Sequence, residues 1–170
     1  MKTKLSVDPQ IRQSLSDFVR ALEAAGNDGF IVSILLLSQD GRRLACLVAP
    51  SLPEEFCAAL EGEFIGPEAG SCGTAAYLGH DVYVHDVSRS PLWARYRDLA
   101  LRHGLRSCWS TPVMGESGEV VATFAIYHRT PGSPAAAEQQ AIRLAAKALL
   151  PLLEARPKRA TRRPKGLVAA

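Results

Sequence analysis

Apolar residues recur along the chain with two periods, one typical of helices and one typical of strands. The first helical face comprises Ile11, Leu15, Phe18 and Leu22. Asp8 followed by Pro9 predicts the start of this helix, and Gly26 predicts its end. A second face, in a long helix within residues 130–155, comprises Ile142, Ala145, Leu149 and Leu152. The chain is therefore expected to begin and end with amphipathic helices.

Between these helices, short apolar or alternating stretches predict five strands. They are residues 30–38, 44–49, 82–87, 105–114 and 119–128. An Asp-Gly turn joins the first two, and the turn-rich segment GESG joins the last two, so each pair is expected to form an antiparallel hairpin. Shorter helices are predicted at 53–62, near 71–74 and at 88–104. This order predicts an α+β fold, with an antiparallel sheet, the terminal helices on one face and the short helices on the other.

Length and composition indicate a single globular domain. The chain has 170 residues, of which 47% are apolar and 22% are charged. No apolar run approaches the roughly 20 residues that cross a bilayer, and the first residues lack the pattern of a secretory signal. We therefore expect a cytoplasmic protein with one domain over residues 1–155.

Charge is unevenly distributed between this domain and residues 156–170. The formal net charge is +3, but residues 156–170 hold six basic residues and no acid, which leaves 14 basic and 17 acidic residues in the rest. We expect this tail to be disordered. It could bind a polyanion such as nucleic acid, but it lacks interleaved aromatic residues, so a solvated tail is favoured and no membrane partner is expected.

Cysteine and histidine spacing argues against a metal or haem site. The four cysteines are Cys46, Cys57, Cys72 and Cys108, and none belongs to a CxxC pair. The four histidines are His80, His85, His103 and His128, which are scattered without ligand spacing. No cofactor is expected, and the cysteines are expected to be free thiols.

The most unusual segment is residues 66–79, with the sequence GPEAGSCGTAAYLG. Cys72 stands where this glycine-rich loop should turn into a helix, whose first N–H groups can bind an anion or lower the pKa of a thiol. Three interpretations stay open for Cys72: a small buried residue that anchors the helix, a ligand contact, or a redox centre. The sequence does not show whether Cys108 lies nearby.

Three blocks of the sequence resemble a GAF domain, a small-molecule-sensing module of bacterial signalling proteins. They are IGPEAGSCGTAAYLGHDVYVHDVSRSPLW, YRDLALRHGLRSCWSTPV and GEVVATFAIYH. The resemblance covers residues 30–153 and implies a central antiparallel sheet with a ligand pocket under the middle helices. GAF domains bind very different ligands, so the resemblance names none.

The resemblance and the local chemistry together suggest a ligand-binding site. Its predicted members are Cys72, Gly73, Thr74, Trp93, Tyr96, Arg106, Cys108, Trp109 and Ser110. The aromatic residues are candidate walls, although each can equally be core, and Arg106 could pair with an anionic ligand. Strand alternation places Cys108 and Ser110 on one face and Trp109 on the other. The expected partners are an unidentified small molecule, for which an anion is one candidate, and a signalling protein.

Two other functions stay open. Free methionine-(R)-sulfoxide reductase has a similar glycine-rich block, and a redox mechanism would use Cys72 and Cys108. However, Gly62 stands where that enzyme has a cysteine, so catalysis is not favoured. The terminal helices could instead form a homodimer of a pure interaction module, or they could simply cover their own sheet.

Overall fold

The computed structural model describes residues 7–154, and the predicted disorder of residues 156–170 lies outside this range. The helices are α1 (Pro9–Ala25), α2 (Glu54–Leu60), α3 (Gly70–Leu78), the 3₁₀-helix η1 (Pro91–Trp93), α4 (Arg97–Arg102) and α5 (Ala136–Glu154). The strands are β1 (Ile31–Leu37), β2 (Arg43–Val48), β3 (Glu63–Phe64), β4 (Val82–Val84), β5 (Ser107–Met114) and β6 (Val120–His128).

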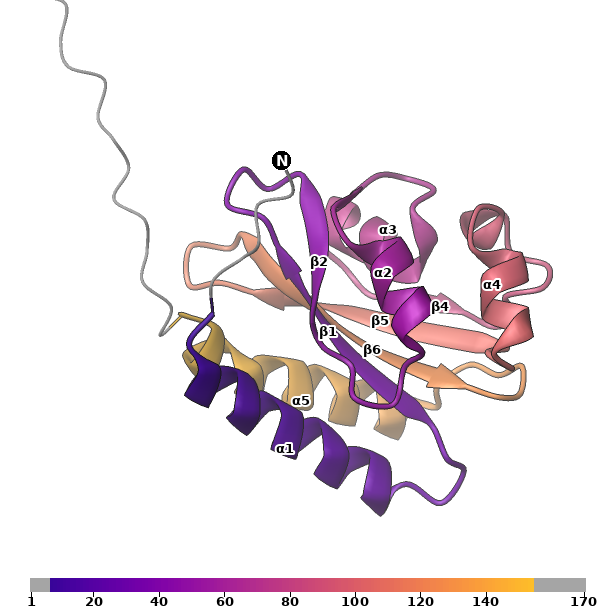
Figure 1. Ribbon diagram of the computed structural model, residues 1–170, viewed down its shortest axis with the longest axis horizontal. Helices are drawn as coiled ribbons and strands as arrows, with labels where there is room; N and C mark the ends of the chain where they lie inside the picture. Colours follow the sequence, from indigo (N-terminus) through magenta and orange to yellow (C-terminus); the bar gives the residue numbers. More distant parts are fainter. Residues whose placement is uncertain (1–6, 155–170) are drawn as a thin grey trace, which may run out of the picture.

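The strands form one six-stranded sheet in the order β3-β2-β1-β6-β5-β4, and every neighbouring pair is antiparallel. The two predicted hairpins are β1–β2 and β5–β6, and pairing of β1 with β6 joins them at the centre. Helices α1 and α5 lie on one face of the sheet, while α2, α3 and α4 lie on the other (Figure 1). The predicted α+β architecture is confirmed.

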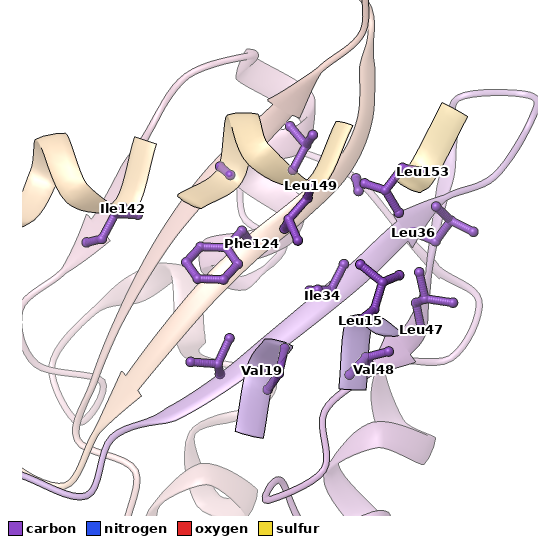
Figure 2. Packing of buried hydrophobic residues seen from close by; sticks show 14 of the residues in the cluster. Leu15, Val19, Ile34, Leu36, Leu47, Val48, Phe124, Ile142, Leu149 and Leu153 are labelled. Atoms are coloured by element: carbon purple, nitrogen blue, oxygen red, sulfur yellow. The ribbon is translucent and has the colours of Figure 1, made fainter. Parts of the chain in front are cut away.

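The face of the sheet beneath α1 and α5, here called the helical face, holds a closely packed apolar core (Figure 2). The Asp8 carboxylate accepts the Gln10 N–H at 2.7 Å and begins α1 as the sequence predicts. In α5 the buried residues are Ile142, Ala146, Leu149 and Leu153. The predicted stripe is therefore off by one residue at two places, because Ala145 and Leu152 lie at the edge of the core and are only partly buried.

The predicted helix over residues 88–104 is interrupted. The structure has the 3₁₀ turn η1, then a break, and then the short helix α4. Trp93, Tyr96 and Ala100 are all buried toward the sheet. The break lets all three face inward, which the sequence pattern alone did not reveal.

Candidate functional site

Two glycines let the preceding loop fold tightly against the N-terminus of α3. Gly70 begins the helix with φ +66°, a conformation that side chains disfavour. A Cβ on Gly73 would stand 2.6 Å from the Cβ of Ala69, so the loop before the helix leaves no room for a side chain there. The first two turns of α3 are consequently buried from Gly70 to Ala76.

A pocket opens between the start of α3, helix α2, η1 and the sheet. The volume of about 400 Å³ counts all the space between the lining atoms together with open solvent at the mouth, so the enclosed part is much smaller. The lining residues are Leu35, Leu44, Phe56, Leu60, Glu63, Phe64, Ala69, Gly70, Ser71, Cys72, Gly73, Trp93, Tyr96 and Tyr127. Most of this lining is apolar, which is typical of a small-molecule site. We call this side of the sheet the pocket face.

Three aromatic rings form the inner walls of the pocket. Phe56 stacks on Trp93 with ring centroids 6.2 Å apart, and Tyr127 meets both rings edge-on at 6.0 and 6.5 Å. The Trp93 indole N–H donates to the Ser71 hydroxyl at 3.0 Å. The Tyr127 hydroxyl lies 3.1 Å from the Ser33 hydroxyl. The polar atoms of these aromatic residues thus have partners, which leaves ring carbons as the main contact surface for a ligand.

One charged side chain, Glu63, is found among the described lining residues, and it lies at the mouth. Its carboxylate pairs with the Arg95 guanidinium at 2.6 Å and accepts the Tyr96 hydroxyl at 3.0 Å. Burial, together with this bond to Glu63, raises the pKa of Tyr96 to about 12. Tyr96 therefore stays neutral at physiological pH, and the Glu63 charge is compensated by Arg95.

Cys72 lies on a polar layer at the inner end of the pocket. Hydrogen bonds from Cys108 lower the pKa of the Cys72 thiol to about 7 against the opposing effect of burial, with Ser110, Tyr127 and Thr123 adding to the effect. The Ser110 and Thr123 hydroxyls are buried near Cys72, and neither has a hydrogen-bond partner within residues 7–154. They are placed to donate once Cys72 is a thiolate.

The structure brings together some of the residues that the sequence suggested. Cys72, Gly73, Trp93 and Tyr96 line the pocket. Cys108 and Ser110 lie behind Cys72 on β5 and do not reach the pocket. Thr74 supports the loop instead, because its hydroxyl accepts the Ala69 N–H at 3.2 Å and lies 3.4 Å from the Pro67 carbonyl oxygen.

Two of the suggested residues lie away from the pocket. Arg106 points toward Asp86, with 3.7 Å between their charged groups, and its side chain is half-exposed. Trp109 belongs to the core of the helical face and donates its indole N–H to the Gly132 carbonyl at 2.9 Å. Strand alternation explains this placement, because Trp109 faces opposite to Cys108. Neither residue belongs to the site proposed below.

Comparisons with known proteins agree with the fold. A family model described as GAF domain matches residues 13–150. The chain belongs to the GAF domain family. A methyl sulfide methyltransferase-associated sensor from Methanosarcina acetivorans is 32% identical over 115 residues, which are 68% of this chain and 12% of that protein. This GAF domain therefore spans about an eighth of that relative's length.

Solved structures share the fold at low sequence identity. The GAF domain region of a putative membrane protein from Geobacter sulfurreducens has a TM-score of 0.70 at 14% identity, covering 85% of this chain and 93% of that one. Type II free methionine-R-sulfoxide reductase from Thermoplasma acidophilum has a TM-score of 0.69 at 16% identity, with the same coverage. At these identities the likeness shows the fold alone.

Several lining residues of this GAF domain were missed by sequence reasoning. They are Leu35, Leu44, Phe56, Leu60, Glu63, Phe64 and Tyr127. Alternation within the strand 119–128 could have placed Tyr127 opposite Phe124, but the pairing with β1 and β5 was needed to place it under Cys72. The two-residue strand β3, which carries the residues of the mouth, has no sequence signal of its own.

Residues 7–154 contain no group of three or more His, Cys, Asp or Glu side chains that could hold a metal ion. Across the same range, every helix is too short or too polar to cross a bilayer.

Proposed function

We propose that this GAF domain is a sensory domain that binds a small, largely apolar molecule in the pocket beside α3 and relays its presence to a partner protein. One observation carries the proposal: three aromatic rings and several aliphatic side chains surround an opening at the buried N-terminus of α3. The relationship to a protein named as a sensor supports the signalling role.

The lining favours an uncharged ligand over an anion. Arg106, which the sequence suggested as the partner of an anionic ligand, is paired with Asp86 and lies outside the pocket. The charge at the mouth is the carboxylate of Glu63, which would repel an anion where Arg95 does not shield it. A molecule with an apolar body and at most one polar group would meet ring carbons inside and the Tyr96–Glu63 pair at the mouth.

Transmission to a partner would run through the sheet. Tyr127 touches the pocket from β6, while its neighbours Phe124 and Ile126 contact the core beneath α1 and α5. The apolar stripes of α1 and α5 cover their own sheet. The proposal includes a homodimer, which would therefore use the outer surfaces of these helices. Leu144 on α5, at 60% exposure, lies on such a surface.

A thermal-shift screen tests this proposal. The panel contains apolar molecules (toluene, indole, dialkyl sulfides) and anions (phosphate, carboxylic acids, nucleotides). We expect some apolar members to raise the melting temperature with concentration, while the anions do not. The variant Leu60→Phe fills the pocket and should abolish the rise, whereas Leu78→Phe, at an exposed position outside the pocket, should preserve it. Stabilisation by the anions alone would contradict the proposed ligand class.

Reductase activity is not part of the proposal. Cys72 is 7% exposed, and Gly62 occupies the position where the resemblance calls for a second cysteine. Thiol-dependent turnover of free methionine sulfoxide that is lost in Cys72→Ser would overturn this conclusion.

A further inference from the structure

A second pair of cysteines lies outside the pocket. The Cys46 thiol on β2 donates to the Cys57 sulfur on α2, with 3.3 Å between the two sulfur atoms. Both side chains are half-buried, and both pack against the core of the pocket face. Neither residue contributes to the site described above. Two thiols in contact on different elements are the starting geometry for a disulfide bond.

We propose that Cys46 and Cys57 form a reversible disulfide when the protein meets a hydroperoxide. The sulfur atoms must approach from 3.3 Å to about 2.0 Å, which side-chain rotation together with a small shift of α2 toward β2 can supply. Helix α2 is seven residues long, and Pro53 precedes it. Gly62 follows it with φ +77°, so the segment that moves is short and ends at a glycine.

The environment makes Cys57 the attacking thiol. The hydrogen bond from Cys46 lowers the pKa of Cys57, although burial and the carboxylates of Glu61 and Glu54 oppose this effect. The same contact raises the pKa of Cys46, which therefore keeps its proton. Since the thiolate is the nucleophile, the peroxide should react first at Cys57.

The chemistry balances with one peroxide molecule. The Cys57 thiolate attacks a peroxide oxygen, the O–O bond breaks, and hydroxide leaves, which gives a sulfenic acid at Cys57. The Cys46 sulfur then attacks the Cys57 sulfur, the S–O bond breaks, and the departing oxygen leaves as water with the Cys46 proton. The first hydroxide takes up the proton that Cys57 had released. Two thiols and one peroxide thus become one disulfide and two waters when the peroxide is hydrogen peroxide.

The other cysteine pair is less suited to this reaction. Cys72 and Cys108 are 7% and 0% exposed, so a peroxide has little access to either sulfur. Cys46 and Cys57 lie nearer the surface. Both pairs consist of interacting thiols, but their solvent accessibility differs. We therefore expect a peroxide to oxidise Cys46 and Cys57 selectively.

The disulfide would also act on the pocket, a consequence that rests on the proposed function. Phe56 and Leu60, which line the pocket, flank Cys57 on α2. A displacement of α2 toward β2 changes the position of this wall, so the oxidised and reduced proteins should differ in ligand affinity.

Mass spectrometry after oxidation tests the disulfide without any ligand. The full chain is treated with hydrogen peroxide, its remaining thiols are alkylated, and it is cleaved after glutamate. Trypsin is unsuitable, because Lys and Arg are absent from residues 44–88 and three of the cysteines would share one peptide. Cleavage after glutamate places Cys46 in peptide 24–54, Cys57 in peptide 56–61, and both Cys72 and Cys108 in peptide 69–116.

We expect peptides 24–54 and 56–61 to become linked, and dithiothreitol to separate them again. Cys46→Ser and Cys57→Ser should each abolish the link, while Cys72→Ser and Cys108→Ser should leave it unchanged. In Cys46→Ser, a sulfenic acid should accumulate at Cys57, where dimedone traps it. Alkylation of all four thiols after peroxide treatment would overturn the proposal, and so would a disulfide found only within peptide 69–116.

The consequence for the pocket has a separate readout. The binders found in the thermal screen are compared on reduced and oxidised protein, with Cys46→Ser as the control that cannot form the bond. A formed disulfide with unchanged binding would refute the effect on the pocket alone. Failure of the screen itself would leave the mass-spectrometric result standing.

Discussion

The two faces of the sheet are built from the same strands but differ in the chemistry of their buried side chains. On the helical face, β1 and β6 present Val32, Ile34 and Phe124, which pack against α1 and α5. On the pocket face, alternate residues of these strands are Ser33, Thr123 and Tyr127, which are all buried. The helical face is mainly apolar, with the buried hydroxyl of Thr111 as an exception, whereas the pocket face has several polar groups and an opening beneath α3. We infer that the helical face supplies stability and the pocket face supplies function.

The largest expected difference concerns two equally buried phenylalanines. Phe124 on the helical face and Phe56 at the pocket are each 1% exposed. Phe124→Ala should reduce the free energy of unfolding by about 3–5 kcal/mol, because it leaves a closed cavity. Phe56→Ala enlarges an opening that already exists, so it should reduce the free energy of unfolding by clearly less. Chemical denaturation of both variants measures the difference, and equal losses would contradict the proposed division between the faces.

A hydroxyl exchange between the faces should have a smaller effect. Val32→Thr places an unpaired hydroxyl in the apolar core and should reduce the free energy of unfolding by about 1–3 kcal/mol. Thr123→Val removes a buried hydroxyl that has no hydrogen-bond partner within the described residues, so the free energy of unfolding should be unchanged or higher. The two melting temperatures provide the comparison. A large loss for Thr123→Val would mean that the polar layer stabilises the fold.

The smallest expected effect is a change in the titration of Cys72. Its lowered pKa, about 7 against an ordinary 9.0, depends most on Cys108. Because the folded pKa is lowered, the contribution of the thiolate to stability is complete above pH 9 and is lost as pH falls through about 7. In Cys108→Ala the thiolate should appear at higher pH, as measured by ultraviolet absorbance in protein lacking Cys46 and Cys57. An unchanged midpoint would remove Cys108 as the cause.

The sequence was most informative where a structural feature depends on interactions between residues that are close together in the chain. Asp8 and Pro9 marked the start of α1, and alternation separated Cys108 from Trp109, because both signals act within a few residues. The two hairpins followed from their turns for the same reason. Each of these predictions was confirmed.

The pocket was harder to predict because its members come from distant segments. Tyr127 lies under Cys72 only through the register of β5 with β6, which pairs Tyr127 with Cys108. Arg106 was a reasonable anion ligand in sequence, yet an ion pair with Asp86 holds it elsewhere. The Cys46–Cys57 contact likewise depends on how α2 packs on β2, which no spacing rule describes.

The chain has two tryptophans, and they report separately on the two faces. Trp93 lines the pocket and donates its indole N–H to Ser71, whereas Trp109 belongs to the helical face and donates to Gly132. An NMR titration with the strongest binder from the thermal screen therefore tests ligand binding directly, with Trp109→Phe assigning the two indole signals. We predict that the Trp93 signal shifts and saturates while the Trp109 signal stays in place. A stationary Trp93 signal across the apolar panel would contradict the proposed binding site.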